Sequence, residues 1–225
     1  LTDNLMLKVV SEIHDPVTTT DELIPSGETS SYRSNPLGLA EFTLSRKDPN
    51  YVRLAKEVQE AEKAREEKVC PVQKFEELEA AWAVMKTITP DADRSNTGIG
   101  STIFAVKPGD GSAREQAASC QKVLGGWANI ANEYATKRYR SNLINWGMLP
   151  FLIKEGELPF KNLDYIYIPG IRRAVEENTE VIKAYVVGSA SGERKKTEFE
   201  MTLGELTDEE RQIILKGCLI NYNRV

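Results

Sequence analysis

The sequence contains few of the residues that most often bind metals or form disulfides. Its 225 residues include one histidine, His14, and three cysteines, Cys70, Cys120 and Cys218. The cysteines are odd in number, far apart and free of any Cys-x-x-Cys pair, which argues against a disulfide framework and a local cluster site. A single histidine argues against a Ser-His-Asp triad or a histidine-rich metal site. We therefore expect reduced, buried thiols and no metal ligands in this chain.

Long apolar runs and an excess of basic residues are also missing. No stretch approaches the roughly 18 apolar residues that span a bilayer, and residues 1–10 lack the pattern of a signal peptide. The 29 Lys and Arg against 34 Asp and Glu give a formal net charge of −5, with no surplus for nucleic acid or anionic lipid. We expect a cytoplasmic protein with no nucleic-acid or membrane partner. The first residue is Leu1, which we interpret as a sign that the chain is part of a longer protein.

The residue pattern that is present predicts a mixed α/β chain. Residues 18–31 are dense in Ser, Thr, Gly and Pro and are expected to form a loop. A thin apolar stripe predicts a solvated surface helix over residues 51–68, and a second helix should direct Leu78, Trp82 and Met85 to the core. Strands are expected at 102–106, 127–134, 163–168, 181–187 and 197–201, a polar linker at 90–100, a hairpin tip at 193–196, and further helices at 112–124, 137–146 and from Thr207, where Glu210 completes a capping box.

A glycine-rich turn runs from Gly109 to Glu115, between a predicted strand and a predicted helix. Glycines let backbone N–H groups approach a ligand, and a helix N-terminus favours an anion. Arg114 adds a guanidinium that can bind a carboxylate or phosphate. However, Ser112 and Glu115 also have the Ser-x-x-Glu spacing of a capping box, which needs no ligand. A nucleotide site is the weakest interpretation, because the P-loop and dinucleotide patterns are absent.

The early loop holds further candidates for an anion site. Arg33 would add a second cation, although a solvated loop arginine is the commoner case. Asp15 and Asp21 are candidates for carboxylates that position other groups, although acidic residues more often cap loops. The sequence around Arg138, Tyr139 and Arg140 is interpreted as a helix start with exposed charge.

Three segments of the chain carry recognisable motifs. Residues 19–27 read TTDELIPSG, residues 111–118 read GSAREQAA, and residues 124–126 and 140–150 read LGG and RSNLINWGMLP. In this order they resemble the TTDHISPAG, GSSREHAA, LGG and SNLIxxGxLP motifs of the fourth, carboxy-terminal domain of the aconitase superfamily. That superfamily also includes homoaconitase and the small subunit of isopropylmalate isomerase. The resemblance extends over residues 15–153.

The resemblance implies a fold and a domain organisation. The fold would be the swivel domain, an α/β structure with a mixed or barrel-like sheet in β/β/α layers and peripheral helices. Residues 1–225 would form this one domain, with a helical insertion around residues 48–90.

The resemblance also implies roles for individual residues. Ser112 matches the serine that acts as catalytic base and removes the proton from the carbon next to the substrate carboxylate. Arg114 and Arg33 match arginines that bind substrate carboxylates. Gly111 and Ala113, in the same turn, are also expected to bind the substrate. Asp21 and Glu115 are expected to support these groups from behind.

The implied reaction is the dehydration and rehydration of a small hydroxy-polycarboxylate by a hydro-lyase. In the family, cysteines of an earlier domain hold a [4Fe–4S] cluster whose open iron binds the departing hydroxyl. The expected partners are therefore a di- or tricarboxylate substrate and the cluster-bearing domains, without which this chain would be inactive.

Several positions depart from the family motifs. Ala113 replaces the second serine of GSSR, Gln116 stands where many members have His, and Glu22 replaces the His of TTDH. The charged helix over residues 51–68 is also unlike the common members. These changes indicate a divergent branch whose substrate need not be citrate. They also motivate an alternative, a non-catalytic module that binds polycarboxylates on the same fold.

Overall fold

A computed structural model describes residues 1–25, 27, 34–68, 76–112 and 115–224. The strands are β1 (Asn4–Ile13), β2 (Thr18–Thr19), β3 (Thr97–Ala105), β4 (Pro108–Asp110), β5 (Gly126–Ala131), β6 (Leu149–Leu152), β7 (Tyr165–Ile168), β8 (Ile182–Gly188) and β9 (Arg194–Met201). The helices are α1 (Thr20–Leu23), α3 (Pro36–Ala40), α4 (Tyr51–Glu66), α5 (Glu76–Ile88), α6 (Gln116–Val123), α7 (Lys137–Asn145), α8 (Ile171–Glu176), α9 (Asp208–Lys216) and α10 (Leu219–Asn223).

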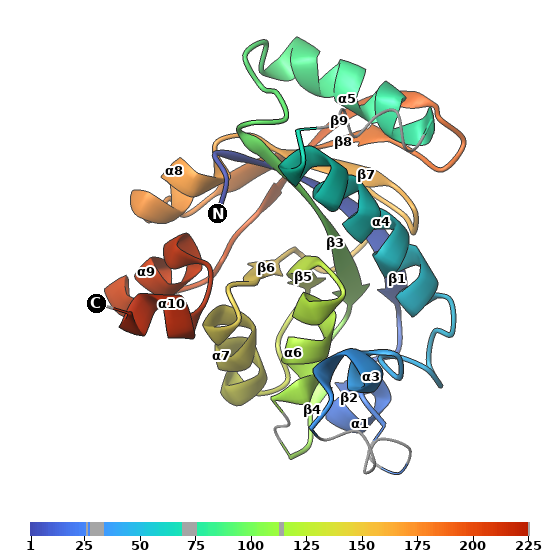
Figure 1. Cartoon of the computed structure of the whole chain (residues 1–225), viewed down its shortest axis with the longest axis vertical. Coiled ribbons are helices and arrows are strands. Elements are labelled where there is room, and N and C mark those ends of the chain that lie inside the picture. The colour runs from blue at the N-terminus through green and yellow to red at the C-terminus, as the bar shows by residue number, and fades with distance from the viewer. Residues whose placement is uncertain (26, 28–33, 69–75, 113–114, 225) are drawn as a thin grey trace.

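Seven strands form one curled sheet in the order β6-β5-β3-β1-β7-β8-β9 (Figure 1). The first four in that order run parallel, and β7, β8 and β9 add antiparallel pairs. The curl brings the two edges together, because Leu152 in β6 exchanges backbone hydrogen bonds of 2.7 and 3.0 Å with Thr202, directly after β9. The expected α/β class, with a barrel-like sheet and peripheral helices, is confirmed.

The central strand β1 is buried on both of its faces. Met6 and Val10 join the apolar cluster under α4, α5 and α6, whereas Leu5, Leu7 and Val9 join the cluster that includes residues of α8 and α9. A strand that is covered on both faces reads as a continuous apolar run and not as an alternation. For that reason residues 1–10 show no alternation of apolar and polar residues that would predict a strand.

Four sequence expectations are corrected by the structure. The helix over residues 51–66 exists, but it is not a solvated surface helix, since seven of its residues are buried, among them Tyr51 and Val58. The expected linker ends earlier, because residues 97–100 are the buried first half of β3. The expected loop begins instead with β2 and α1. Residues 194–196 belong to β9 and are not the hairpin tip. Partners far away in the chain produce the first three differences, whereas Arg194 pairs with Gly188, six residues before it.

Other expectations are confirmed. Leu78, Trp82 and Met85 are buried on α5. Thr207 is the N-cap of α9, and Glu210 completes its capping box.

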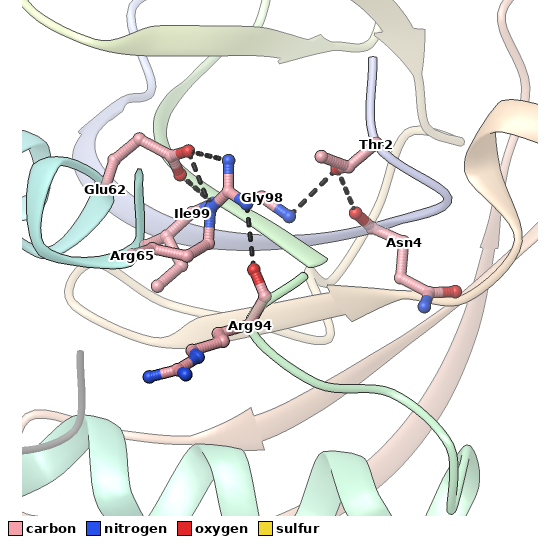
Figure 2. A network of polar contacts seen from close by, with 7 residues as sticks. All are labelled: Thr2, Asn4, Glu62, Arg65, Arg94, Gly98 and Ile99. Atoms are coloured by element: carbon pink, nitrogen blue, oxygen red, sulfur yellow. Dashed lines mark hydrogen bonds and ion pairs between the residues drawn. The ribbon is translucent and has the colours of Figure 1, made fainter. Parts of the chain in front are cut away.

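A buried carboxylate fastens α4 to the start of β3 (Figure 2). Glu62 accepts a hydrogen bond from Arg65 Nε at 2.8 Å, and its second oxygen accepts from the backbone N–H of Ile99. Pairing between β3 and β5 begins only at Ser101, so the N–H of Ile99 has no strand partner on that side. Arg65 also donates to the carbonyl of Arg94 at 2.9 Å. Burial raises the pKa of Glu62 above its ordinary value of 4.5, although Arg65 opposes the rise.

We predict that Glu62→Ala lowers the free energy of unfolding by about 3 kcal/mol, because it leaves a buried N–H and a largely buried guanidinium without their partner. Glu60→Ala, on the same helix, is the control. Its carboxylate forms a surface pair with Lys63 at 3.5 Å, and its loss should cost less than about 0.5 kcal/mol. Urea unfolding of the chain measures both values. Equal effects of the two variants would contradict the role of Glu62.

The raised pKa of Glu62 also predicts a dependence of stability on pH. A carboxyl whose pKa is raised by folding stabilises the fold below its unfolded value, and this contribution is lost as the pH rises through the folded pKa. Glu62→Gln keeps an oxygen acceptor but does not titrate. Wild-type stability relative to Glu62→Gln should therefore fall as the pH rises above the ordinary carboxyl value of 4.5. Unfolding measured at several pH values tests this, and a relative rise would contradict it.

Candidate functional site

Two short strands bring the first and second motif segments together. β2 and β4 pair in parallel, with Thr18 opposite Pro108 and Thr19 opposite Asp110, apart from the main sheet. β2 continues into α1, and β4 continues into the turn that contains Ser112. Figure 1 shows β2, β4, α1 and α3 gathered at one end of the molecule, next to α6. Segments that lie about ninety residues apart in sequence are thus neighbours in the fold.

A hydrogen bond joins the two segments directly. Thr20, the first residue of α1, donates from Oγ1 to the backbone carbonyl of Ser112 at 3.0 Å. Thr20 is only 3% exposed, whereas Gly111 and Ser112 are both exposed. Gly111 has φ +104°, a left-handed conformation that favours glycine. A buried threonine therefore holds the backbone of an exposed serine.

The turn is supported from behind by α7. Gly109 has φ +99°, and a Cβ atom at this position would lie 2.4 Å from the ring of Tyr139. The hydroxyl of Tyr139 donates to Asn129 Oδ1 at 2.6 Å and accepts from Gln121 Nε2 at 2.9 Å. Burial raises the pKa of Tyr139, so the phenol stays protonated. One satisfied polar network therefore connects β5, α6 and α7 beneath the turn.

We predict that Gly109→Ala is far more damaging than the same replacement at a positive-φ glycine with open surroundings. The added methyl group must displace the ring of Tyr139, and the alanine backbone must also adopt a left-handed conformation. Together these effects should cost about 3–4 kcal/mol of stability. Gly192 is the control, since it has φ +77° and no atom within 4 Å of an added Cβ. Gly192→Ala should cost only about 1 kcal/mol. Chemical unfolding of both variants gives the comparison, and similar losses would show that Tyr139 does not constrain the turn.

The helix after the turn does not start at Ser112, where the Ser-x-x-Glu spacing predicts its start. α6 begins at Gln116, and its N-cap is Glu115, which makes no side-chain capping hydrogen bond. The expected helix start at Ser112, with Glu115 completing a capping box, is therefore wrong. The carbonyl of Ser112 is instead bound by Thr20 in a bend four residues before the helix. The capping-box explanation for Ser112 is thereby removed.

The carboxylate of Glu22 has structural partners. Glu22 completes a capping box with Thr19, whose N–H donates to Glu22 Oε1 at 3.2 Å. Its other oxygen lies 3.2 Å from Lys47 Nζ, and Lys47 also binds Asp15. The hydrogen bond to Asp15 raises the pKa of Lys47, and the same bond lowers the pKa of Asp15. The residue that stands in place of the expected histidine therefore anchors α1.

Two of the remaining predicted site residues are among the described residues, and three are not. Asp21 is exposed on α1, beside Thr20. Glu115 lines a pocket of about 230 Å³ with Asn142, Asn145, Trp146 and Cys218. Arg33, Ala113 and Arg114 lie outside the described residues.

The structure reveals supporting residues that sequence reasoning missed. Thr20 stood within a motif, but nothing local marked its hydroxyl as a link to Ser112. Tyr139 was interpreted as part of an exposed helix start, yet it is buried. Arg140 is also more than surface charge, since its Nη2 donates to the carbonyls of Leu203 and Glu205 at 3.0 and 2.8 Å.

The described part of the chain has no group of three or more His, Cys, Asp or Glu side chains that could hold a metal ion. His14 is exposed and lies 2.6 Å from Glu12. Cys120 is buried and Cys218 is partly exposed, while Cys70 lies outside the described residues. In the same described ranges, no helix has the length and apolar character needed to cross a membrane.

Comparison with known proteins finds a matching family model and similar solved structures. Residues 52–156, which include β3 to β6 and the Ser112 turn, match the model of the Aconitase C-terminal domain family. The crystal structure of a 3-isopropylmalate dehydratase from Methanocaldococcus jannaschii is similar with a TM-score of 0.53 at 19% sequence identity, over 99% of this chain and 93% of that chain. At this identity the structural likeness concerns the fold. No curated protein matches the sequence.

Proposed function

We propose that this chain is a swivel domain of the aconitase type, which binds a small hydroxy-polycarboxylate and supplies the base of a hydro-lyase reaction. The observation that carries the proposal is the contact between the two motif segments, in which Thr20 holds the exposed Ser112. A serine that caps no helix but is fixed by its backbone at the molecular surface is suited to act on a ligand. The 3-isopropylmalate dehydratase with a similar fold bears a name of the same reaction class.

In the proposed mechanism, Ser112 Oγ accepts the proton from the carbon next to a substrate carboxylate. A double bond forms between that carbon and its neighbour as the neighbour loses its hydroxyl. A serine is a weak base at its ordinary pKa, so it must act as an alkoxide or nearly so. The backbone N–H groups of the turn and the guanidinium of Arg114 would stabilise this negative charge.

The arginines would determine the substrate class. Arg114 and Arg33 would each bind one carboxylate through the planar fork of the guanidinium, which suits a di- or tricarboxylate. Gly111 and Ala113 would line the same turn and allow close approach of the substrate. Asp21 and Glu115 would support these groups from α1 and from the start of α6.

The resemblance to the aconitase superfamily implies a [4Fe–4S] cluster, which would supply the Lewis acid for loss of the hydroxyl. The described residues of this chain do not fit such a cluster, because they offer no suitable group of ligands. We place the cluster in separate cluster-bearing domains that face the Ser112 turn, and we expect the isolated chain to show no turnover.

The first test is Ser112→Ala in the assembly of this chain with its cluster-bearing domains. We expect kcat for dehydration to fall by about three orders of magnitude or more, with little change in KM, because the carboxylate-binding arginines remain. The assay follows the ultraviolet absorbance of the unsaturated product from citrate, isocitrate, homocitrate, isopropylmalate and methylcitrate. Substantial turnover by Ser112→Ala would remove the base assignment.

Stability provides the control for this variant. Since Ser112 caps no helix, Ser112→Ala should change the free energy of unfolding by less than about 0.5 kcal/mol. Thr207→Ala removes a true N-cap, so it should cost about 1 kcal/mol and leave kcat unchanged. If the wild-type assembly binds the polycarboxylates in calorimetry but turns none of them over, the alternative of a non-catalytic binding module is favoured.

A further inference from the structure

We infer that Thr20 is a positioning residue for Ser112, which it orients through the hydrogen bond to the Ser112 carbonyl. This inference rests on the proposed function, because it assigns Thr20 a part in the reaction of that site. Thr20 does not contact substrate in this proposal. It acts by fixing the peptide that carries the base.

The contact has the features of a fixed anchor. Thr20 is buried, and its Oγ1 lies 3.0 Å from the carbonyl oxygen of the exposed Ser112. A Cβ built on Gly111 would lie 3.4 Å from the same Oγ1, so this oxygen also lies close to Gly111. The backbone orientation of Ser112, which its carbonyl shares, determines where Ser112 Oγ can point. Displacement of a reacting group by about 1 Å can lower a rate about 10²-fold.

The threonine is itself held in place. α1 has four residues, a length that is not stable in isolation. Three kinds of contact stabilise it: the capping box between Thr19 and Glu22, the ion pairs of Lys47, and a backbone hydrogen bond of 2.9 Å from Leu44 to Leu23. Leu23 is also fully buried. The hydroxyl that donates to Ser112 is therefore held in place by α1, and it positions the exposed turn.

The pairing of β2 with β4 provides the frame for this contact. Thr18 N–H donates to the carbonyl of Lys107 at 2.9 Å, and Thr19 lies opposite Asp110. The ladder ends at these residues, so the backbone beyond Asp110 has no further strand partner in this small sheet. The side chain of Thr20 supplies the next link between the segments. The Thr20 hydroxyl thus adds one hydrogen bond beyond the β2–β4 pairing, and this bond is made to Ser112, the proposed base.

The experiment uses the assembled enzyme with Thr20→Val, which keeps the shape of the side chain and removes the donor. We expect kcat to fall about 10²-fold while KM stays within about twofold and the unfolding midpoint is unchanged. Thr20→Ser, which restores the hydroxyl, should recover most of the lost rate. Thr87→Val is the matched control, because Thr87 Oγ1 donates to the carbonyl of Val84 at 2.6 Å on α5, and it should leave kcat unchanged.

A double variant separates positioning from general structural support. If Thr20 acts through Ser112, then Thr20→Val should not lower the residual rate of Ser112→Ala any further. An equal loss in both backgrounds, or no rescue by Thr20→Ser, would overturn the inference, and so would an unchanged kcat in Thr20→Val. Should Thr20→Val fail to fold, Thr20→Ser and Thr20→Ala compared at equal folded fraction decide the question by the same criteria.

The inference and the proposed function fail in different ways. Absence of turnover in the wild-type assembly, or full activity of Ser112→Ala, contradicts the proposed function whatever Thr20 does. Loss of activity in Ser112→Ala combined with normal activity in Thr20→Val contradicts the positioning role alone.

Discussion

The parallel pairing of β1 with β3 determines where the candidate site can form. The register runs from Asn4 opposite Thr97 to Ile13 opposite Ala105, so the two strands end side by side. The carboxyl ends of parallel strands share one edge of a sheet, and ligand sites of open α/β sheets lie outside that edge. The chain leaves both strands there, and the short pairing of β2 with β4 continues the contact. The contact between α1 and the Ser112 turn follows from this single register.

The sheet around this pair is stabilised by buried polar groups at both ends. At the start of β3, Glu62 supplies the acceptor that the strand N–H of Ile99 lacks. Beneath the Ser112 turn, Gln121, Asn129 and Tyr139 satisfy one another. Polar networks of this kind specify a unique arrangement when every member has its partner. The Glu62 contacts add a polar attachment to α4, whose buried apolar residues also pack on the sheet.

The candidate site therefore combines an exposed turn with a rigid support. Gly111 and Ser112 are open to solvent, whereas Thr20, which donates to the Ser112 carbonyl, is buried. Gly109, just before the turn, and Tyr139, which packs against Gly109, are buried as well. Functional groups are positioned best by residues that are themselves locked by packing and hydrogen bonds. Glu22, which stands where the aconitase motif has a histidine, fits this arrangement, because its carboxylate caps α1 and pairs with Lys47.

The sequence by itself determined the α/β class, the apolar face of α5, the capping box at Thr207 and the three motif segments that indicate the aconitase superfamily. These are local signals, since each depends on residues within a few positions of one another. The tertiary structure alone decided that β1 is a central strand, that α4 is buried, and that Ser112 lies in a bend held by Thr20 and not at a helix cap. Each of these features depends on a partner far away in the chain, and no short pattern records which distant backbone will satisfy a hydrogen bond or cover an apolar face.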